Sequence, residues 1–278
     1  MRLASLHDVE VKIEVATQQL HALDVEFDNR REAGEYRYSV EICRGGLHHV
    51  YRVIDPPPDG RYWGAQIGAV AHALRSSLEH LAWQLVIANQ GSPNNSTHFP
   101  IYERKPDKGK ELGVTGGVPS EALKIIEAAQ PYNGTSGGKK LAAIHKLDVF
   151  DKHRELVVTA ARVELASTSG PAPLPQNSIA FTRRPLTNDN VVAVVKYVDA
   201  RSEADPNLSF IPYMTFGVGA PYRGEIVSGF MWELLAFIEN DFVPRFHQWV
   251  PPTPRPMNLP SLTRSRIATA NRVSAGEG

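Results

Sequence analysis

Residues 61–90 have the sequence RYWGAQIGAVAHALRSSLEHLAWQLVIANQ, and the interpretation of the chain starts from this stretch. Its large apolar side chains recur at steps of three and four residues: Ile67, Val70, Leu74, Leu78, Leu81 and Leu85. Such spacing puts them in one stripe on an α-helix with 3.6 residues per turn. The stretch therefore predicts a long amphipathic helix whose apolar stripe faces a core.

A long helix is also predicted near the N-terminus. Its apolar residues follow the same alternating steps: Leu6, Val9, Ile13, Ala16, Leu20, Leu23 and Phe27. This narrow seam suits a helical hairpin or a contact between two copies, although a helix that simply faces the core is the reading we prefer. Further helices are expected at about 120–130, 138–156 and 224–248.

Two other parts of the chain have the pattern of strands. Residues 36–54 alternate apolar and polar side chains around Gly45-Gly46, which predicts a β-hairpin. Later strands are expected at 157–165, 178–183, 191–198 and 208–218. The sequence therefore predicts an α+β fold, with a bundle of four to five helices, a β-hairpin and an inserted antiparallel β-meander.

The domain organisation follows from the order of these elements. We expect residues 1–250 to form a single α+β domain with a strand-rich insertion at about 157–220, because a helix is predicted on each side of that insertion. A separate β domain near 157–220 is the alternative. Residues 251–278 are rich in proline and arginine and predict a disordered basic tail, through which a protein partner could bind.

The composition limits the function classes. Lys and Arg total 30, as do Asp and Glu, so overall charge does not favour nucleic-acid binding and any basic surface must be local. The single cysteine, Cys43, excludes an internal disulfide framework and a cysteine-rich zinc site. No apolar run approaches the roughly 20 residues that span a bilayer, and no signal-peptide pattern is present. We expect a cytoplasmic protein with no membrane partner and no cofactor.

The helix predicted at 61–90 has a polar face opposite its apolar stripe. His72, Ser76, Glu79 and Trp83 centre on that face, with Arg75 at one edge and His80 at the other. A helix surface turned toward water or a partner protein accounts for these residues without catalysis.

Arg75 and His80 are separated by four residues, and Ser76 follows the arginine directly. This pattern resembles the Arg-x(4–6)-His motif of ribonucleases in the HEPN superfamily. The resemblance implies a helical bundle, metal-independent RNA cleavage in a toxin or defence setting, and a homodimer in which the motifs meet. Arg75 would stabilise phosphate charge, His80 would act as acid or base, and Ser76 would orient one of them.

The geometry of an ideal helix limits this reading. Arg75 and His80 lie about 140° apart around the helix axis. Both can therefore face one phosphate only if the helix is distorted or a second chain completes the site. Residues 74–83, 99–102 and 151–154 together also resemble a widespread group of bacterial proteins, and that resemblance implies no function.

A second polar cluster lies in the helix predicted at 138–156. His145, Asp148 and Lys152 fall on one face of that helix, close to apolar residues. If these side chains are buried, they must pair with one another. This predicts an ion-pair network that braces the bundle. The functional alternative is that Lys152, His153 or Arg154 reaches the same pocket as His80 and binds phosphate. The substrate-binding residues would then be His72, Glu79, His145, Asp148, Lys152, His153 and Arg154.

Three function classes remain open. The preferred one is the metal-independent endoribonuclease, which should hold His80 in an open groove. The second is a non-catalytic dimeric scaffold, which should bury Trp83 and Glu79 in a contact. The third is a small-molecule or metal enzyme built on His145, Asp148 and Lys152, although no metal-ligand spacing such as Glu-x-x-His is present and no metal ligands are assigned.

Overall fold

The computed structural model confirms the α+β class. The residues it describes are 3–33, 37–54, 60–107, 112, 114, 116–168, 178–181, 190–203 and 208–253. They divide between two compact units, each assembled from separate segments of the chain. The first is formed within 1–21, 66–154 and 229–278, and the second within 22–65 and 155–228.

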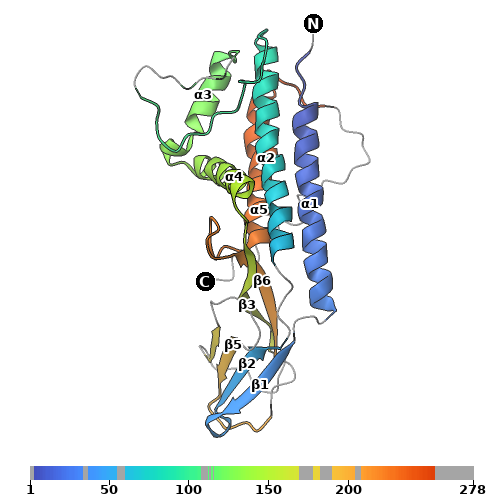
Figure 1. Ribbon diagram of the computed structural model, residues 1–278, viewed down its shortest axis with the longest axis vertical. Coiled ribbons are helices and arrows are strands. Elements are labelled where there is room, and N and C mark those ends of the chain that lie inside the picture. The colour runs from blue at the N-terminus through green and yellow to red at the C-terminus, as the bar shows by residue number, and fades with distance from the viewer. Residues whose placement is uncertain are drawn as a thin grey trace. The chain divides into compact units, whose positions relative to one another are not determined.

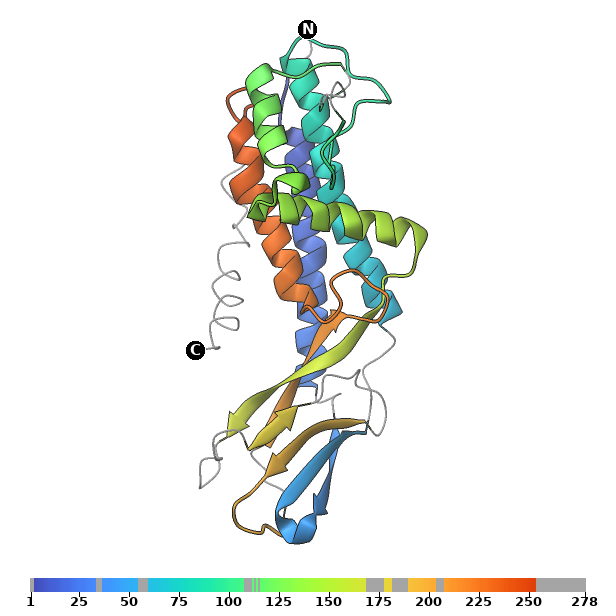
Figure 2. The same cartoon turned by 90° about the vertical axis from the view of Figure 1, so that its left-hand side faces the viewer.

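The first unit is helical. Its elements are α1 (His7–Glu32), α2 (Arg61–Ala88), α3 (Ser120–Ala128), α4 (Ser136–His153) and α5 (Val227–Ala236), of which α1, α2 and α5 also contribute residues to the second unit. Within the first unit, α1, α2 and α5 run side by side (Figure 1), and α4 crosses α2 (Figure 2). The crossing brings the polar face of α4 onto the polar face of α2.

The predicted apolar stripes form the core of this unit. Leu6, Val9, Ile13, Ala16 and Leu20 of the N-terminal segment are at most 4% exposed. The residues of the α2 stripe are at most 1% exposed: Ile67, Val70, Leu74, Leu78, Leu81 and Leu85. Each fully buried Leu contributes about 1.5–3 kcal/mol by leaving water. The seam of α1 is thus core-facing within one chain, the reading preferred from its spacing.

A cluster of three packed aromatic rings, which we call the aromatic stack, fixes the start of the segment Phe99–Tyr102, which borders the candidate functional site. After α5 the chain continues as a π-helical turn (Phe237–Phe242) and a 3₁₀ turn (Val243–Phe246). The ring of Phe242 packs edge-on against Phe99 at 5.7 Å and against Phe246 at 5.3 Å. All three rings are fully buried, so the backbone of Phe99 has a fixed position.

The buried amide of Gln130 secures the residues that follow. Its Nε2 donates to the carbonyl of Pro100 at 2.9 Å, and its Oε1 accepts from the amide of Tyr102 at 2.9 Å. A fully buried side chain with these hydrogen bonds holds an irregular segment in place as strand pairing would. The segment from Phe99 to Tyr102 is therefore held in place at both of its ends.

The second unit contains the strands. In one antiparallel sheet, β1 (Tyr38–Cys43), β2 (His48–Val53), β5 (Val191–Lys196) and β4 (Ile179–Phe181) lie in the order β1-β2-β5-β4. A two-stranded ladder pairs β3 (Val158–Thr168) with β6 (Leu208–Phe216). The strands are antiparallel, as expected, but their order is not that of a simple meander. The later strands instead pair with the hairpin and with each other across long connections.

The hairpin forms where the glycine pair predicts it. Gly45 and Gly46 adopt positive φ angles of 63° and 93° in the connecting turn. A Cβ atom on Gly46 would lie 2.7 Å from the carbonyl oxygen of Arg201, so that position also needs glycine for space. Buried residues then pack the sheet from β2, β5 and β6: Tyr51, Val53, Val192, Ala193, Val195, Tyr197 and Phe210.

Several expectations lie partly or wholly outside the described residues. The tail from 254 onward is outside them, and so are 108–111, 113 and 115 of the segment 103–119. The expectation that 1–250 folds as one domain stays a prediction. Among the helices that the structure describes, none is both long and apolar enough to cross a membrane.

Candidate functional site

The two polar faces predicted on separate helices meet where α2 crosses α4. A Cβ atom at Gly68 of α2 would collide with the carboxylate of Asp151 of α4. Glycine at this position therefore permits a close approach of the two helices. The polar side chains one or two turns further along α2 then lie opposite those of α4.

Arg75 is the most buried cation of this region, with 9% of its surface exposed. Its Nη2 donates to the carbonyl of Phe99 at 2.9 Å and pairs with Oε1 of Glu79 at 2.6 Å. Burial lowers the pKa of Arg75 below its usual range, and the nearby Glu79 opposes that shift. A guanidinium stays charged in proteins, so the site contains a fixed positive charge. Its buried Nη1 has no hydrogen-bond partner among the described residues.

Glu79 is held from two sides. Its Oε1 faces Arg75, and its Oε2 accepts a 2.6 Å hydrogen bond from the backbone amide of Phe99. Arg75 and Glu79 therefore clamp the carbonyl and the amide of the same residue. Because the aromatic stack fixes Phe99, the clamp orients both side chains before any ligand arrives.

Asp148 organises the opposite wall. Its carboxylate, 3% exposed, accepts from Nδ1 of His72 at 2.8 Å and from Nζ of Lys152 at 2.7 Å. The hydrogen bond from Nδ1 orients the imidazole of His72 and leaves its Nε2 free to exchange a proton. His72 and Lys152 are half-exposed, so both partners of the buried carboxylate remain accessible from the pocket.

His145 provides a second imidazole with a different character. Burial lowers its pKa below the ordinary 6.5, and the positive charge of Arg75 lowers it further, while Asp148 opposes the shift. Its Nδ1 is buried and has no hydrogen-bond partner among the described residues. The ring is therefore neutral at pH 7 and available as a proton acceptor.

These groups line one pocket of about 230 Å³. It contains most of the residues predicted from the two helix faces, together with Val149: His72, Arg75, Ser76, Glu79, His145, Asp148 and Lys152. His153 and Arg154 do not line it. They are exposed at the end of α4, where the Arg154 guanidinium lies 5.7 Å from the Phe150 ring centre. We call this cavity the α2–α4 pocket.

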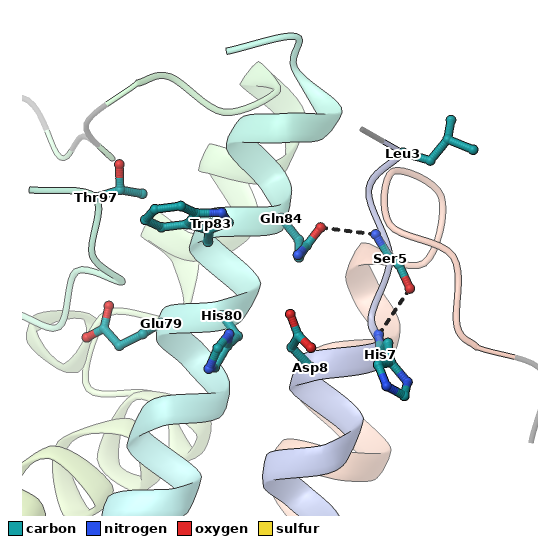
Figure 3. Close-up of a pocket in the computed structure, with 9 residues that line it drawn as sticks. All are labelled: Leu3, Ser5, His7, Asp8, Glu79, His80, Trp83, Gln84 and Thr97. Carbon is teal, nitrogen blue, oxygen red and sulfur yellow. Dashed lines mark hydrogen bonds between the residues drawn. The ribbon is translucent and has the colours of Figure 1, made fainter. Parts of the chain in front are cut away.

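His80 lines a different cavity of about 520 Å³. The side chains of His80 and Asp8 lie on opposite walls, one from α2 and the other from the start of α1 (Figure 3). Glu79 borders this cavity as well as the α2–α4 pocket. We call the larger cavity the Trp83 groove. Arg75 and His80 thus open into different cavities of one chain, as the angle between them on a straight helix requires.

No sequence pattern predicted the second wall of this groove. Leu3, Ser5, His7 and Asp8 come from the N-terminal segment, far along the chain from Trp83. One hydrogen bond ties the two walls together, from the amide of Ser5 to Oε1 of Gln84 at 3.1 Å (Figure 3). Only the packing of α1 beside α2 brings these residues together, and no local pattern encodes that packing.

The structure also bears on the metal alternative. His72 and His145 line the same pocket. Within the described ranges, however, no three His, Cys, Asp or Glu side chains are grouped so that they could hold a metal ion. The arrangement instead combines a guanidinium, an ammonium and two imidazoles with the carboxylates of Glu79 and Asp148, a set of groups able to bind an anion and to transfer protons.

Comparison with known proteins finds no matching family model, no matching curated protein and no matching solved structure. The resemblance to the HEPN superfamily therefore stays a prediction from the Arg75-to-His80 motif. The functional argument rests on the geometry of the two cavities.

Proposed function

We propose that the protein is a metal-independent endoribonuclease whose catalytic centre is the α2–α4 pocket. One observation carries the proposal. The unpartnered Nη1 of Arg75 and the unpartnered Nδ1 of His145 are both buried at a pocket that His72 also lines. Buried polar atoms without partners are costly, and a bound phosphate with its neighbouring hydroxyl would satisfy both.

Each group has a defined role in the cleavage. His145 accepts the proton of a ribose 2′-hydroxyl, whose oxygen then attacks the adjacent phosphorus. The bond from phosphorus to the 5′-oxygen breaks, and protonated His72 donates its Nε2 proton to that leaving oxygen. Arg75 and Lys152 stabilise the charge on the phosphorane. The products are a 2′,3′-cyclic phosphate and a free 5′-hydroxyl.

The two imidazoles are suited to opposite roles. Burial and Arg75 favour the neutral form of His145, which is the form that a base needs. The carboxylate of Asp148 accepts a hydrogen bond from Nδ1 of His72, which holds the ring and leaves its Nε2 to donate to the leaving oxygen. One imidazole that acts as base and a second that is oriented as acid form the pair that this cleavage needs.

This proposal differs from the HEPN-like reading in its catalytic histidines. There, His80 is the acid or base, and a second copy of the chain would have to bring it to Arg75. Here, His72 and His145 complete the site within one chain. A homodimer and a toxin or defence role belong to the HEPN-like reading, whereas the cytoplasmic location and a partner on the basic tail were predicted from composition, and all four stay predictions.

The test uses total RNA in excess chelator with the purified protein. We compare His145→Asn, His72→Asn and His80→Asn, with His247→Asn as the matched control because His247 is exposed and lines neither cavity. We expect His145→Asn and His72→Asn to reduce cleavage at least about 100-fold. His247→Asn should cleave like the unchanged protein and leave 2′,3′-cyclic phosphate ends.

The other outcomes are decisive as well. Loss of cleavage in His80→Asn alone would move catalysis to a site shared by two copies, as the HEPN-like reading requires. Equal cleavage by all variants would identify a contaminating nuclease. An absence of cleavage at high protein concentration would reject the endoribonuclease.

One observation favours a second candidate, a non-catalytic scaffold. Arg75 and Lys152 are each already paired with a carboxylate, so the cluster also braces α2 against α4. A scaffold would keep its oligomeric state and partner binding in His145→Asn, because that ring makes no hydrogen bond through its buried Nδ1. Sedimentation of His145→Asn beside the unchanged protein measures the oligomeric state. A scaffold keeps that state in the variant and cleaves no RNA in either protein, which separates it from the first candidate.

A further inference from the structure

The Trp83 groove has no part in the cleavage chemistry described above. Its volume of about 520 Å³ lies in the range of about 300–1,000 Å³ that small-molecule sites occupy. The indole of Trp83 lies along one wall beside Thr97, and the Asp8 carboxylate stands on the opposite wall (Figure 3). Trp83 is half-buried, so its ring is supported by the protein and still accessible.

Three polar groups of the groove, on Asp8, His80 and Trp83, are available to a ligand. Among the described residues, neither the Asp8 carboxylate, the His80 ring nor the Trp83 Nε1 takes part in a hydrogen bond or ion pair. The described residues that line the groove include no lysine or arginine, but they include the carboxylates of Asp8 and Glu79. Such a groove repels a phosphate and suits a flat, uncharged ring with N–H donors at its edge.

Glu79 connects this groove to the catalytic pocket. Its side chain borders both cavities, so they lie on its two sides. The clamp formed by Arg75 and the Phe99 amide prevents Glu79 from swinging into either one. One nucleotide could therefore extend past this wall, with its phosphate beside Arg75 and its base beside Trp83.

We propose that the Trp83 groove is a base-binding subsite that selects guanine next to the scissile phosphate; this rests on the endoribonuclease function proposed above. The base stacks on Trp83, as single-stranded RNA bases do on aromatic side chains. Guanine is selected because its N1–H and N2–H donors are adjacent and match both oxygens of the Asp8 carboxylate. Uracil offers a single N–H donor and cannot make this pair.

The experiment measures binding without cleavage. The probes are the dinucleotides GpU, UpG and UpU, each with a 2′-deoxyribose as its first sugar so that no 2′-hydroxyl can attack. Isothermal titration should show that GpU or UpG binds about tenfold more tightly than UpU, since one stacked and hydrogen-bonded base supplies at least that factor. Trp83→Ala and Asp8→Asn should abolish the difference, and Trp83→Phe should retain part of it.

A further variant separates this inference from the proposed function. Arg75→Lys should weaken the binding of all three dinucleotides by a similar factor and leave the guanine preference intact. A preference that depends on Trp83 and Asp8, without any effect of Arg75→Lys, would retain the base subsite and reject the phosphate pocket. Equal binding of the three probes, or a preference unchanged in Asp8→Asn, would overturn the subsite. Asp8 is exposed, so its substitution leaves the fold intact.

Discussion

The α2–α4 pocket and the Trp83 groove share the helix α2 and the side chain of Glu79, but their chemistry differs. The pocket contains a buried guanidinium, a buried carboxylate with two partners, and two imidazoles. The groove is larger and aromatic on one wall, and among the described residues its Asp8 carboxylate, His80 ring and Trp83 Nε1 make no hydrogen bond or ion pair. One helix thus presents a preorganised charged face to α4 and an aromatic face to the groove. The chemistry of each cavity depends both on the α2 side chains and on the element opposite them, α4 or the start of α1.

The largest expected effect contrasts the carboxylates of the two cavities. Asp148→Ala should lower the free energy of unfolding by about 2–3 kcal/mol, because two charge-assisted hydrogen bonds to a buried carboxylate are lost. Asp8→Ala is the matched control and should lower it by about 0.5 kcal/mol, since Asp8 is exposed in the first turn of α1. Urea unfolding measures both. Equal losses would show that the pocket is no more preorganised than the groove.

A smaller effect is expected at the wall between the cavities. Glu79→Gln keeps the shape of the side chain but removes the charge that faces Arg75 and the Phe99 amide. We expect a loss of about 1.5–2 kcal/mol in the free energy of unfolding, because only one of the two hydrogen bonds persists. Glutamine keeps one acceptor oxygen, and its NH2 group must then face the other donor. A double-mutant cycle with Arg75→Met should give a coupling energy of similar size. Strictly additive losses would mean that the clamp does not act as a unit.

The smallest expected effect is on the pH dependence of the free energy of unfolding, and it arises only in the α2–α4 pocket. The pKa of His145 is below 6.5 in the folded protein, so the unfolded chain binds more protons between that pKa and 6.5. The contribution of His145 to the free energy of unfolding is therefore fully present above pH 6.5 and declines as the pH falls through this window. Urea unfolding at about pH 7.5 and about pH 5.5 measures this loss of stability. We expect the loss to be smaller in His145→Gln than in the unchanged protein. His247→Gln, outside both cavities, should leave it unchanged.

The pKa of His145 can also be measured directly. Nuclear magnetic resonance of the imidazole nitrogens should place the midpoint for His145 below 6.5, and Arg75→Gln should raise it toward the ordinary value. A midpoint at or above 6.5 would contradict both the burial of the ring and the role as a base that we propose for it.

Much of the α2–α4 pocket could be predicted from the sequence, because periodicity identifies the faces of a helix. The spacing of Ile67, Val70 and Leu74 defined the buried stripe of α2, and thereby the opposite face that carries His72, Ser76 and Glu79. The same reasoning put His145, Asp148 and Lys152 on one face of α4. A helix has one period, so one stripe of apolar residues determines where every other side chain points.

The strands were found by composition, but their partners were not. Residues 191–196 have the branched apolar side chains of a buried strand, yet nothing local indicates that β5 pairs with β2 of the hairpin. Strand pairing depends on contacts between distant segments, and several orders satisfy the same alternation of side chains. The expected meander was the simplest of those orders and not the one that forms.

The sequence by itself determined the α+β class, the buried stripes of α1 and α2, and the set of polar residues from which a site could be built. Only the tertiary structure decided which of them meet. It brought His72 and Arg75 to His145, left His153 and Arg154 at the surface, and turned His80 toward Asp8. The physical reason is that local periodicity specifies the faces of each helix, whereas the crossing of α2 and α4 depends on close packing at Gly68 between segments far apart in the chain.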